Sequence, residues 1–217
     1  ILLTHIYGVD IDAQAVEVTK LSLLLKVLEG ENNESLNQQS QLFQERVLPD
    51  LSENIKCGNS LIAPDFYENV QPHLLGEEEH YRINVFDWQD EFAEVFADGG
   101  FDAVIGNPPY GGLITKTEER YYQARYHHQN NYKDLYLLFL ERYQHLLKPS
   151  HPLGVIVSNT WLQSLTFTAI REHLTQAYVW ERILEIPSHI FKAVVDTHVL
   201  IFRKEQYTST PDLTFAV

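Results

Sequence analysis

FDAVIGNPPYGG, residues 101–112, contains the sharpest structural signal in this 217-residue sequence. An apolar run over 103–105 leads into a glycine, an asparagine, two prolines and an aromatic residue. Proline lacks a backbone N–H and has a fixed φ, so two in succession end any strand or helix. We therefore expect a buried strand over 101–105 that stops at a rigid polar turn.

Strands and helices are predicted to alternate along the rest of the chain. Apolar residues at strand spacing predict strands at 6–11, 55–61, 153–157, 180–186, 194–202 and 213–217. Helical periodicity predicts helices at 13–28, 132–147 and 167–176. This alternation predicts an α/β protein with a three-layer sheet. Two polar stretches, about 29–52 and 64–99, are interpreted as insertions with short helices near 41–48 and 91–96, and 111–130 has no clear period.

Composition and charge narrow the class of protein. No apolar run reaches the roughly 20 residues that a membrane span needs, so no membrane partner is expected. The single cysteine, Cys57, excludes an internal disulfide framework and a cysteine zinc cluster, and fits a reducing cytoplasm. Residues 1–100 hold 19 acidic and five basic residues, which accounts for the whole net charge of −14. Proteins that grip nucleic acid by its phosphates are usually basic, so the main grip on DNA is not expected here.

Polar residues follow three of the predicted strands: Asp10, the pair Asn59 and Ser60, and the turn at 107–110. In open α/β sheets, ligands bind at the edge formed by the carboxyl ends of the strands. An acid directly after a strand is the usual partner of the ribose hydroxyls of a nucleotide cofactor. Taken singly, Asp10 also fits a helix cap and Asn59 a simple turn. The three clusters together favour a cofactor site.

The turn Asn107-Pro108-Pro109-Tyr110 suits chemistry on an aromatic amine. Such a nitrogen is a poor nucleophile because its lone pair is delocalised into the ring. Two acceptors, the Asn107 side-chain oxygen and the Pro108 carbonyl, would take hydrogen bonds from its two N–H groups and favour a localised lone pair. The prolines hold that carbonyl stiffly, and Tyr110 offers a flat face for a base. The alternative is a Pro-Pro stop in an ordinary loop.

The hexapeptide IGNPPY, residues 105–110, resembles the catalytic motif of amino-methylating, adenine-specific DNA methyltransferases, in particular the methylase part of type IIG restriction-modification enzymes. This resemblance implies a Rossmann-like fold and methyl transfer from S-adenosylmethionine to the exocyclic amino group of adenine in DNA, with Asn107, Pro108 and Tyr110 as catalytic residues. Residues 7–12, YGVDID, are similar to the family's second motif, which implies that Asp10 binds the cofactor ribose and Ile11 packs on its adenine. CGNSL at 57–61 resembles the third motif and implies cofactor contacts from Asn59 and Ser60.

Downstream segments extend the resemblance over nearly the whole chain. Residues 132–136 with 146–149 resemble the helix and loop after the catalytic motif, and 154–162 resembles the following strand. Residues 190–197 are similar to the late motif whose aromatic residue stacks on the flipped adenine, which implies that Phe191 and Tyr110 hold that base between them. Taken alone, Phe191 fits a core position better.

The family pattern also extends beyond both ends of this sequence. Its glycine-rich first motif is expected before Ile1, together with a strand that lies between those ending at Asp10 and Ile105. A target-recognition domain that binds double-stranded DNA is expected beyond Val217. Residues 1–217 are therefore interpreted as part of a methyltransferase catalytic domain from a bacterial cytoplasmic enzyme. Alone, they are expected to bind S-adenosylmethionine weakly or not at all.

Other interpretations remain open at this point. A glutamine amide poses the same delocalised-nitrogen problem, so the same tetrapeptide fits a protein-glutamine or ribosomal-RNA methyltransferase, and a non-catalytic scaffold subunit would not use Asn107. The stretch 116–133 interleaves basic and aromatic residues, which fits either contact with phosphates and bases or a plain polar loop. Adjacent His127 and His128 point different ways on most backbones, so no metal site is predicted, and no nuclease motif of the PD…(D/E)xK type is present.

Overall fold

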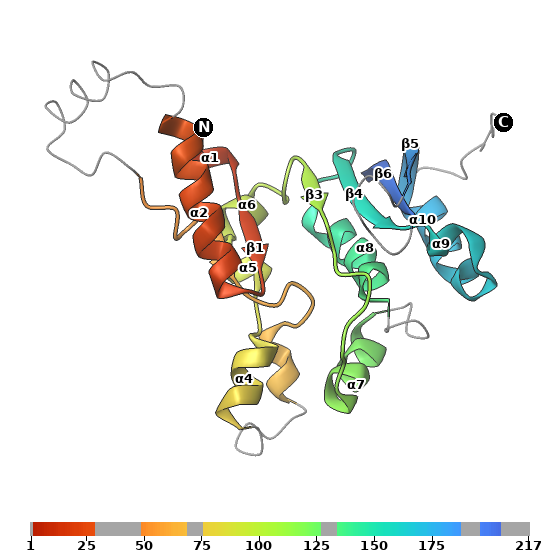
Figure 1. The fold of residues 1–217 in the computed structure, drawn as a ribbon, viewed down its shortest axis with the longest axis horizontal. Helices are drawn as coiled ribbons and strands as arrows, with labels where there is room; N and C mark the ends of the chain where they lie inside the picture. Colours follow the sequence, from red (N-terminus) through yellow and green to blue (C-terminus); the bar gives the residue numbers. More distant parts are fainter. Residues whose placement is uncertain (1, 29–48, 69–75, 127–133, 188–195, 205–217) are drawn as a thin grey trace, which may run out of the picture. The chain divides into compact units, whose positions relative to one another are not determined.

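The computed structural model describes residues 2–28, 49–68, 76–126, 134–187 and 196–204 (Figure 1). The chain divides into two compact units, residues 1–91 and residues 92–217, and each is described by itself. Several predicted features lie outside the described residues: the helix near 41–48, the strand at 213–217, the pair His127 and His128, and Phe191.

The first unit is built on a two-stranded parallel sheet. After a short α1 (Leu2–His5), β1 (Gly8–Asp10) pairs with β2 (Ile55–Cys57), and Asp10 lies opposite Cys57. Between the strands runs α2 (Ala13–Leu28), which matches the predicted helix at both ends. It begins where the Asp12 carboxylate accepts the N–H groups of Gln14, at 2.8 Å, and Ala15, at 3.4 Å, as an N-cap residue does. Val16 on α2 and Ile55 on β2 belong to the same buried cluster.

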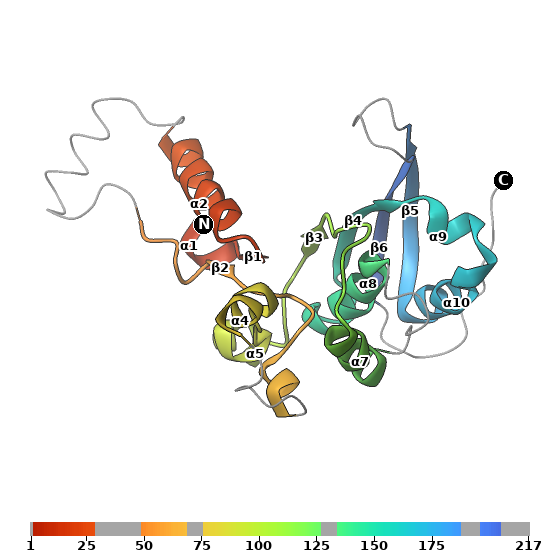
Figure 2. The same ribbon diagram turned by 60° about the horizontal axis from the view of Figure 1, so that its bottom comes forward.

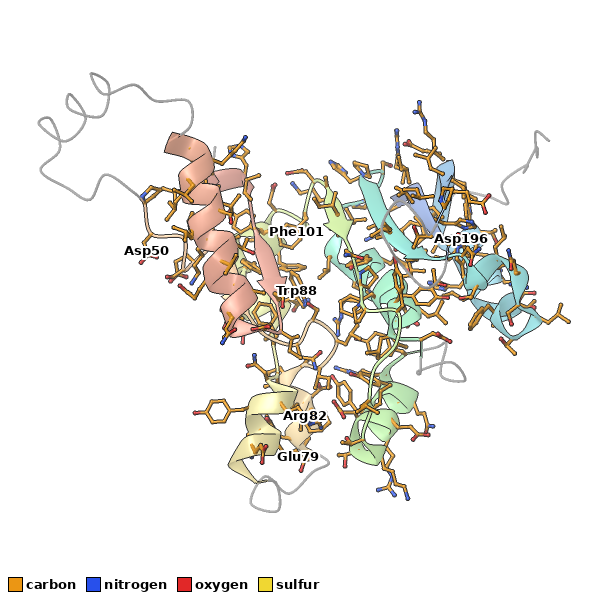
Figure 3. The ribbon with its side chains drawn as sticks, in the orientation of Figure 1. Asp50, Glu79, Arg82, Trp88, Phe101 and Asp196 are labelled. Carbon is orange, nitrogen blue, oxygen red and sulfur yellow. The ribbon has the colours of Figure 1, made fainter. Side chains whose placement is uncertain are left out.

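The predicted irregular stretch 64–99 is more helical than expected. Its described part contains η1 (Pro64–Glu68), α4 (Glu77–Ile83) and α5 (Trp88–Glu91) in the first unit and α6 (Ala93–Ala97) in the second. On α4, Arg82 lies 3.8 Å from Glu79 one turn earlier (Figure 3), and the helix ends at Asn84, whose φ of 45° is the left-handed conformation common at helix ends. The acidic composition hid these helices, because they bury few apolar side chains: Phe66 is buried on η1 and Ile83 on α4, whereas α5 and α6 bury none.

The second unit is a four-stranded mixed sheet. Its strands are β3 (Val104–Gly106), β4 (Pro152–Ser158), β5 (Tyr178–Ile186) and β6 (Thr197–Lys204), in the spatial order β3-β4-β6-β5. β3 and β4 are parallel, whereas β6 is antiparallel to both β4 and β5. Figure 2 shows β5 and β6 running side by side over their length. β3 is an edge strand, and its Ile105 is 89% exposed, so the strand predicted to be buried is open on this side.

Helix α8 (Leu135–Leu146) is the central helix of the second unit. It is buried on most of its surface, including Tyr136, Leu137, Leu138 and Leu140, each 0% exposed. Of its side chains only His145 is exposed, and α8 lies against the β3 and β4 end of the sheet in both views (Figures 1 and 2). Its last turn is tied to the segment just before β3 by the Phe101 N–H, which donates to the Leu146 carbonyl at 2.8 Å. α8 therefore fixes the strand that leads into the Asn107 turn.

Helix α7 (Lys116–Arg125) is a correction to the sequence prediction, which found no period at 111–130. A capping box starts it: the Thr115 hydroxyl accepts the Glu118 N–H at 3.3 Å, and the Glu118 carboxylate accepts the Thr115 N–H at 2.8 Å. The helix was missed because only Glu118 and Tyr122 are buried, so its apolar face is too narrow to give a periodic signal.

The remaining helices pack on the far part of the same sheet. They are α9 (Thr160–Gln163), η4 (Leu165–Phe167) and α10 (Thr168–Ala177). The chain turns from β4 into α9 where the Asn159 N–H donates to the Asp196 carbonyl at 3.1 Å (Asp196 is labelled in Figure 3). None of the helices in the described parts of the chain combines the length and the apolar character needed to cross a bilayer.

A buried histidine lies in the core of this unit. His198 on β6 is 5% exposed, and its Nδ1 accepts the indole N–H of Trp161 at 3.2 Å, while Trp161 stacks on Trp180 with ring centroids 5.4 Å apart. Burial lowers the pKa of His198 below its ordinary 6.5, and the nearby carboxylates of Glu185 and Asp196 offset this only in part. His198 is therefore held in its neutral form.

We expect His198 to make the stability of the protein sensitive to acid. Its pKa is lower in the folded state, so below about pH 6.5 the unfolded chain binds this proton more readily and the free energy of unfolding falls. Denaturant titrations between pH 7.5 and pH 5.5 should show a shallower pH dependence in His198→Gln than in the wild type. An identical pH dependence in the two proteins would contradict this assignment.

Candidate functional site

The turn after β3 presents an unpaired asparagine. Asn107 is exposed, and its side chain has no hydrogen-bond partner among the described residues. Pro108 behind it is buried, whereas Pro109 is exposed. A buried proline with a fixed φ anchors the turn while the adjacent amide faces outward. The Asn107 side-chain oxygen is thus free of any hydrogen bond from a described residue.

Helix α8 packs against this turn at three points. A Cβ placed on Gly106 would lie 2.2 Å from the Tyr143 hydroxyl, so only glycine fits between β3 and α8. The Tyr110 ring meets the Tyr136 ring edge to face, with centroids 6.3 Å apart. A Cβ on Gly112 would lie 3.0 Å from Leu135. The backbone from 106 to 112 is therefore shaped by one helix.

The supporting tyrosines are themselves held in place. Tyr136 and Tyr143 are seven residues apart on α8, which places them on one face two turns apart. The Tyr136 hydroxyl is within 3.2 Å of the Thr160 hydroxyl, which lies 3.0 Å from the Ser158 hydroxyl at the end of β4. Burial raises the pKa of Tyr136 to about 12, with the Thr160 hydrogen bond opposing it, and burial also raises the pKa of Tyr143. Both hydroxyl groups therefore stay protonated, and the two tyrosines position the turn by packing against it.

In the first unit, the predicted cofactor residues follow adjacent parallel strands. Asp10 ends β1, and Asn59 lies two residues after the end of β2. Asp10 is exposed; one carboxylate oxygen accepts the Asp12 N–H at 2.8 Å, which leaves the second oxygen for a ligand. Ile11 is 53% exposed, so its side chain is accessible to a ligand.

Asn59 and Ser60 are more constrained than the sequence suggested. Asn59 is 9% exposed, and its side-chain oxygen already accepts the Leu61 N–H at 3.0 Å, so it does serve as a turn residue. A carbonyl oxygen has two lone pairs, and one remains for a ligand. The Ser60 carbonyl accepts the Trp88 indole N–H at 3.2 Å, and Figure 3 labels Trp88 in the same unit. Asp10 and Ile11 therefore fit a nucleoside better than this pair does.

A pocket of about 340 Å³ opens beside these strands in the first unit. It is lined from α2, β2, Phe86 and Glu91, and includes Cys57, but none of the four predicted cofactor residues. Its Lys56 is already paired with Glu91, at 2.7 Å, and Glu53, at 3.3 Å. The pocket thus adjoins the predicted cofactor residues without containing them.

Sequence reasoning missed the residues that shape the Asn107 turn. Gly106 begins this turn and Tyr136 and Tyr143 lie against it, yet Tyr143 lies 37 positions from Gly106, and no local pattern links them. Phe191, the predicted second stacking residue, lies outside the described residues and stays a prediction. No group of three or more histidine, cysteine or acidic side chains within the described residues could hold a metal ion.

The sequence is similar to proteins of restriction-modification systems. Over 212 residues it is 30% identical to the type II restriction enzyme and methyltransferase RM.Eco57I of Escherichia coli, which covers 95% of this chain and 19% of that protein. Over 101 residues it is 30% identical to the type II methyltransferase M.BstVI of Geobacillus stearothermophilus, covering 46% of this chain and 18% of that protein. The chain thus spans about a fifth of the length of these relatives.

Among solved structures, the M protein of the type I restriction enzyme EcoKI aligns with 93% of this chain and 40% of its own, at 17% identity and a TM-score of 0.46. A TM-score below 0.5 does not establish a shared fold, so the assignment rests on sequence. Residues 4–191 match the family described as Eco57I restriction-modification methylase, which agrees with the family predicted from the catalytic and cofactor motifs. The chain belongs to the Eco57I restriction-modification methylase family.

Proposed function

We propose that this chain is the catalytic part of an adenine-specific DNA methyltransferase in a restriction-modification enzyme. The reaction transfers a methyl group from S-adenosylmethionine to the exocyclic amino group of adenine in double-stranded DNA. The observation that carries the proposal is the exposed, unpartnered side chain of Asn107 on a turn that α8 holds rigidly. Membership in a restriction-modification methylase family supports the reaction class.

The Asn107 turn would prepare the amino group for attack. Its two N–H groups would donate to the Asn107 side-chain oxygen and the Pro108 carbonyl, so the nitrogen lone pair turns out of the ring. S-adenosylmethionine, held by Asp10 and Ile11, would supply the methyl group, and the amino group would release one proton to solvent as it accepts the methyl group. Because the acceptors are preorganised, little reorganisation is needed during the reaction.

Tyr110 would orient the base that carries this amino group. An enzyme that reacts with a base must take it out of the duplex, and an aromatic side chain can stack on it. Tyr110 is half-buried on Tyr136, so its position is set while part of its ring stays accessible. Phe191 is the proposed second side of this base site.

Asp10 and Ile11 are the proposed nucleoside contacts of the cofactor. The free carboxylate oxygen of Asp10 suits the ribose hydroxyls, and the exposed Ile11 side chain suits the face of the adenine. Asn59 and Ser60 would contact the adenine edge from the neighbouring strand. The acidic first hundred residues argue that the grip on DNA phosphates lies mostly elsewhere in the full-length protein.

The proposal is tested by the identity of the methyl acceptor. The full-length protein that carries this chain should be incubated with radiolabelled S-adenosylmethionine in three separate reactions. The methyl acceptor is duplex DNA in the first, ribosomal RNA in the second and a glutamine-containing protein in the third. We expect label in the DNA, recovered after digestion as N6-methyladenine. Label in RNA or in a glutamine amide would replace this proposal with one of the two alternatives that share the tetrapeptide.

A further inference from the structure

Helix α7 carries two basic side chains that nothing in the described part of the second unit neutralises. Lys116 and Arg120 are exposed, four residues apart, and neither forms an ion pair or a hydrogen bond with a described residue. Residues four apart on a helix are neighbours on one face. We call Lys116 and Arg120 the basic face of α7.

The other face of α7 is fixed to the protein. Glu118, Tyr122 and Tyr126 are 6%, 3% and 5% exposed and also follow each other at four-residue spacing. The Arg142 guanidinium on α8 donates to the Tyr126 hydroxyl at 2.9 Å and lies over the Tyr126 ring, 5.6 Å from its centroid. Because this face is anchored, the basic face must point outward.

The basic and the aromatic residues of α7 have different roles, which the sequence alone could not distinguish. The stretch 116–133 interleaves basic and aromatic residues, and both kinds were candidates for contact with nucleic acid. The structure buries Tyr122 and Tyr126, so these rings serve the core and are not available to stack on bases. On α7 this leaves the half-buried Tyr121 and the exposed cations within reach of a ligand.

The charges are not explained by helix stability. Lys116 is the first residue of α7, where the positive end of the helix dipole disfavours a cation. The acid next to Arg120 is Glu119, whose carboxylate accepts the Gln123 amide N–H at 3.4 Å. Two other basic residues of this unit form ion pairs: Lys148 pairs with Asp98 and Asp102, and Arg203 pairs with Glu181.

We propose that the basic face of α7, Lys116 and Arg120, contacts the DNA sugar-phosphate backbone beside the base that Asn107 acts on. The proposal rests on the proposed function and adds to it a phosphate contact. α7 begins four residues after Gly112, the end of the turn that α8 shapes, so a duplex presented to Asn107 comes close to this face. Phosphate contacts of this kind set the register of a protein on DNA without reading sequence.

The test is the salt dependence of DNA binding by the full-length protein. The logarithm of the binding constant falls with the logarithm of salt concentration with a slope of about −0.9 per phosphate contacted. In the double variant Lys116→Gln/Arg120→Gln, the slope should therefore become shallower by about 1.8. Equivalently, the loss of affinity between 50 and 200 mM salt should shrink by about tenfold.

Arg182→Gln provides the matched control. Arg182 is an exposed arginine on the edge strand β5 of the same unit, and it too lacks a partner among the described residues. Its neutralisation should leave the slope at the wild-type value. An equal change in Arg182→Gln, or an unchanged slope in the double variant, would overturn the proposal. If methyl transfer to DNA is normal when the phosphate contact fails its test, the proposed function still stands. A wild-type protein that binds no DNA would refute both the phosphate contact and the proposed function.

Discussion

Replacement of Asn107 by alanine is expected to lower the rate of methyl transfer by about a hundredfold or more, because one of two positioned acceptors is lost. The fold should be unaffected, since the Asn107 side chain is exposed and bonds to no described residue. The measurement is the single-turnover rate of the full-length protein on duplex DNA, together with the thermal midpoint as a check on folding.

Asn107→Asp is the informative companion variant. A carboxylate keeps acceptor oxygens at the same position, so this variant should retain more activity than Asn107→Ala. Alanine activity within a few-fold of the wild type would refute the acceptor mechanism. Equal and complete loss in both variants, with a lowered thermal midpoint, would show that Asn107 acts through the fold instead.

Gly106→Ala is expected to be nearly as damaging, although residue 106 touches no substrate in the proposed mechanism. The added Cβ would lie 2.2 Å from the Tyr143 hydroxyl and 2.7 Å from the carbon that bears it, so either α8 or the turn must shift. A displacement of about 1 Å in a catalytic group can cost on the order of a hundredfold in rate. We expect a loss of that size in kcat on duplex DNA.

Two further variants separate this clash from a general intolerance of substitution. Tyr143→Leu shortens the side chain, so Gly106→Ala/Tyr143→Leu should be more active than Gly106→Ala alone, a non-additivity typical of residues in contact. Gly154→Ala is the matched control on the neighbouring strand, since its Cβ would meet Ile105 at an ordinary 3.8 Å. Wild-type activity in Gly106→Ala, or a double variant worse than either single one, would contradict the proposed role of Tyr143.

The sequence predicted secondary structure best where the signal was local and strong. Helix α2 was predicted to the residue, because Asp12 caps it and its apolar residues recur at helical spacing. Strand β3 was predicted from 101, whereas it begins at Val104, since the preceding residues are tied to the end of α8 instead. Helix α7 was missed even though its capping box, Thr115 and Glu118, was readable in the sequence.

The sequence by itself determined the chemistry that the chain can carry. The Asn-Pro-Pro-Tyr turn and the acid after β1 are short segments whose properties follow from residue type, and they were enough to predict the family. Proline rigidity, amide acceptors and a terminal carboxylate at a strand end do not depend on distant partners. Their roles in catalysis and cofactor binding are proposals, and the Asn107 variants test the catalytic role.

Only the tertiary structure decided how that chemistry is held and which charges face outward. Tyr143 meets Gly106, and Tyr136 meets Tyr110, across separations of 37 and 26 positions, where no periodicity operates. Burial is likewise a property of packing, so sequence could not tell that Tyr122 and Tyr126 turn inward while Lys116 and Arg120 turn outward. Short segments of sequence set the chemistry of a residue, whereas contacts between distant segments set its position and its exposure.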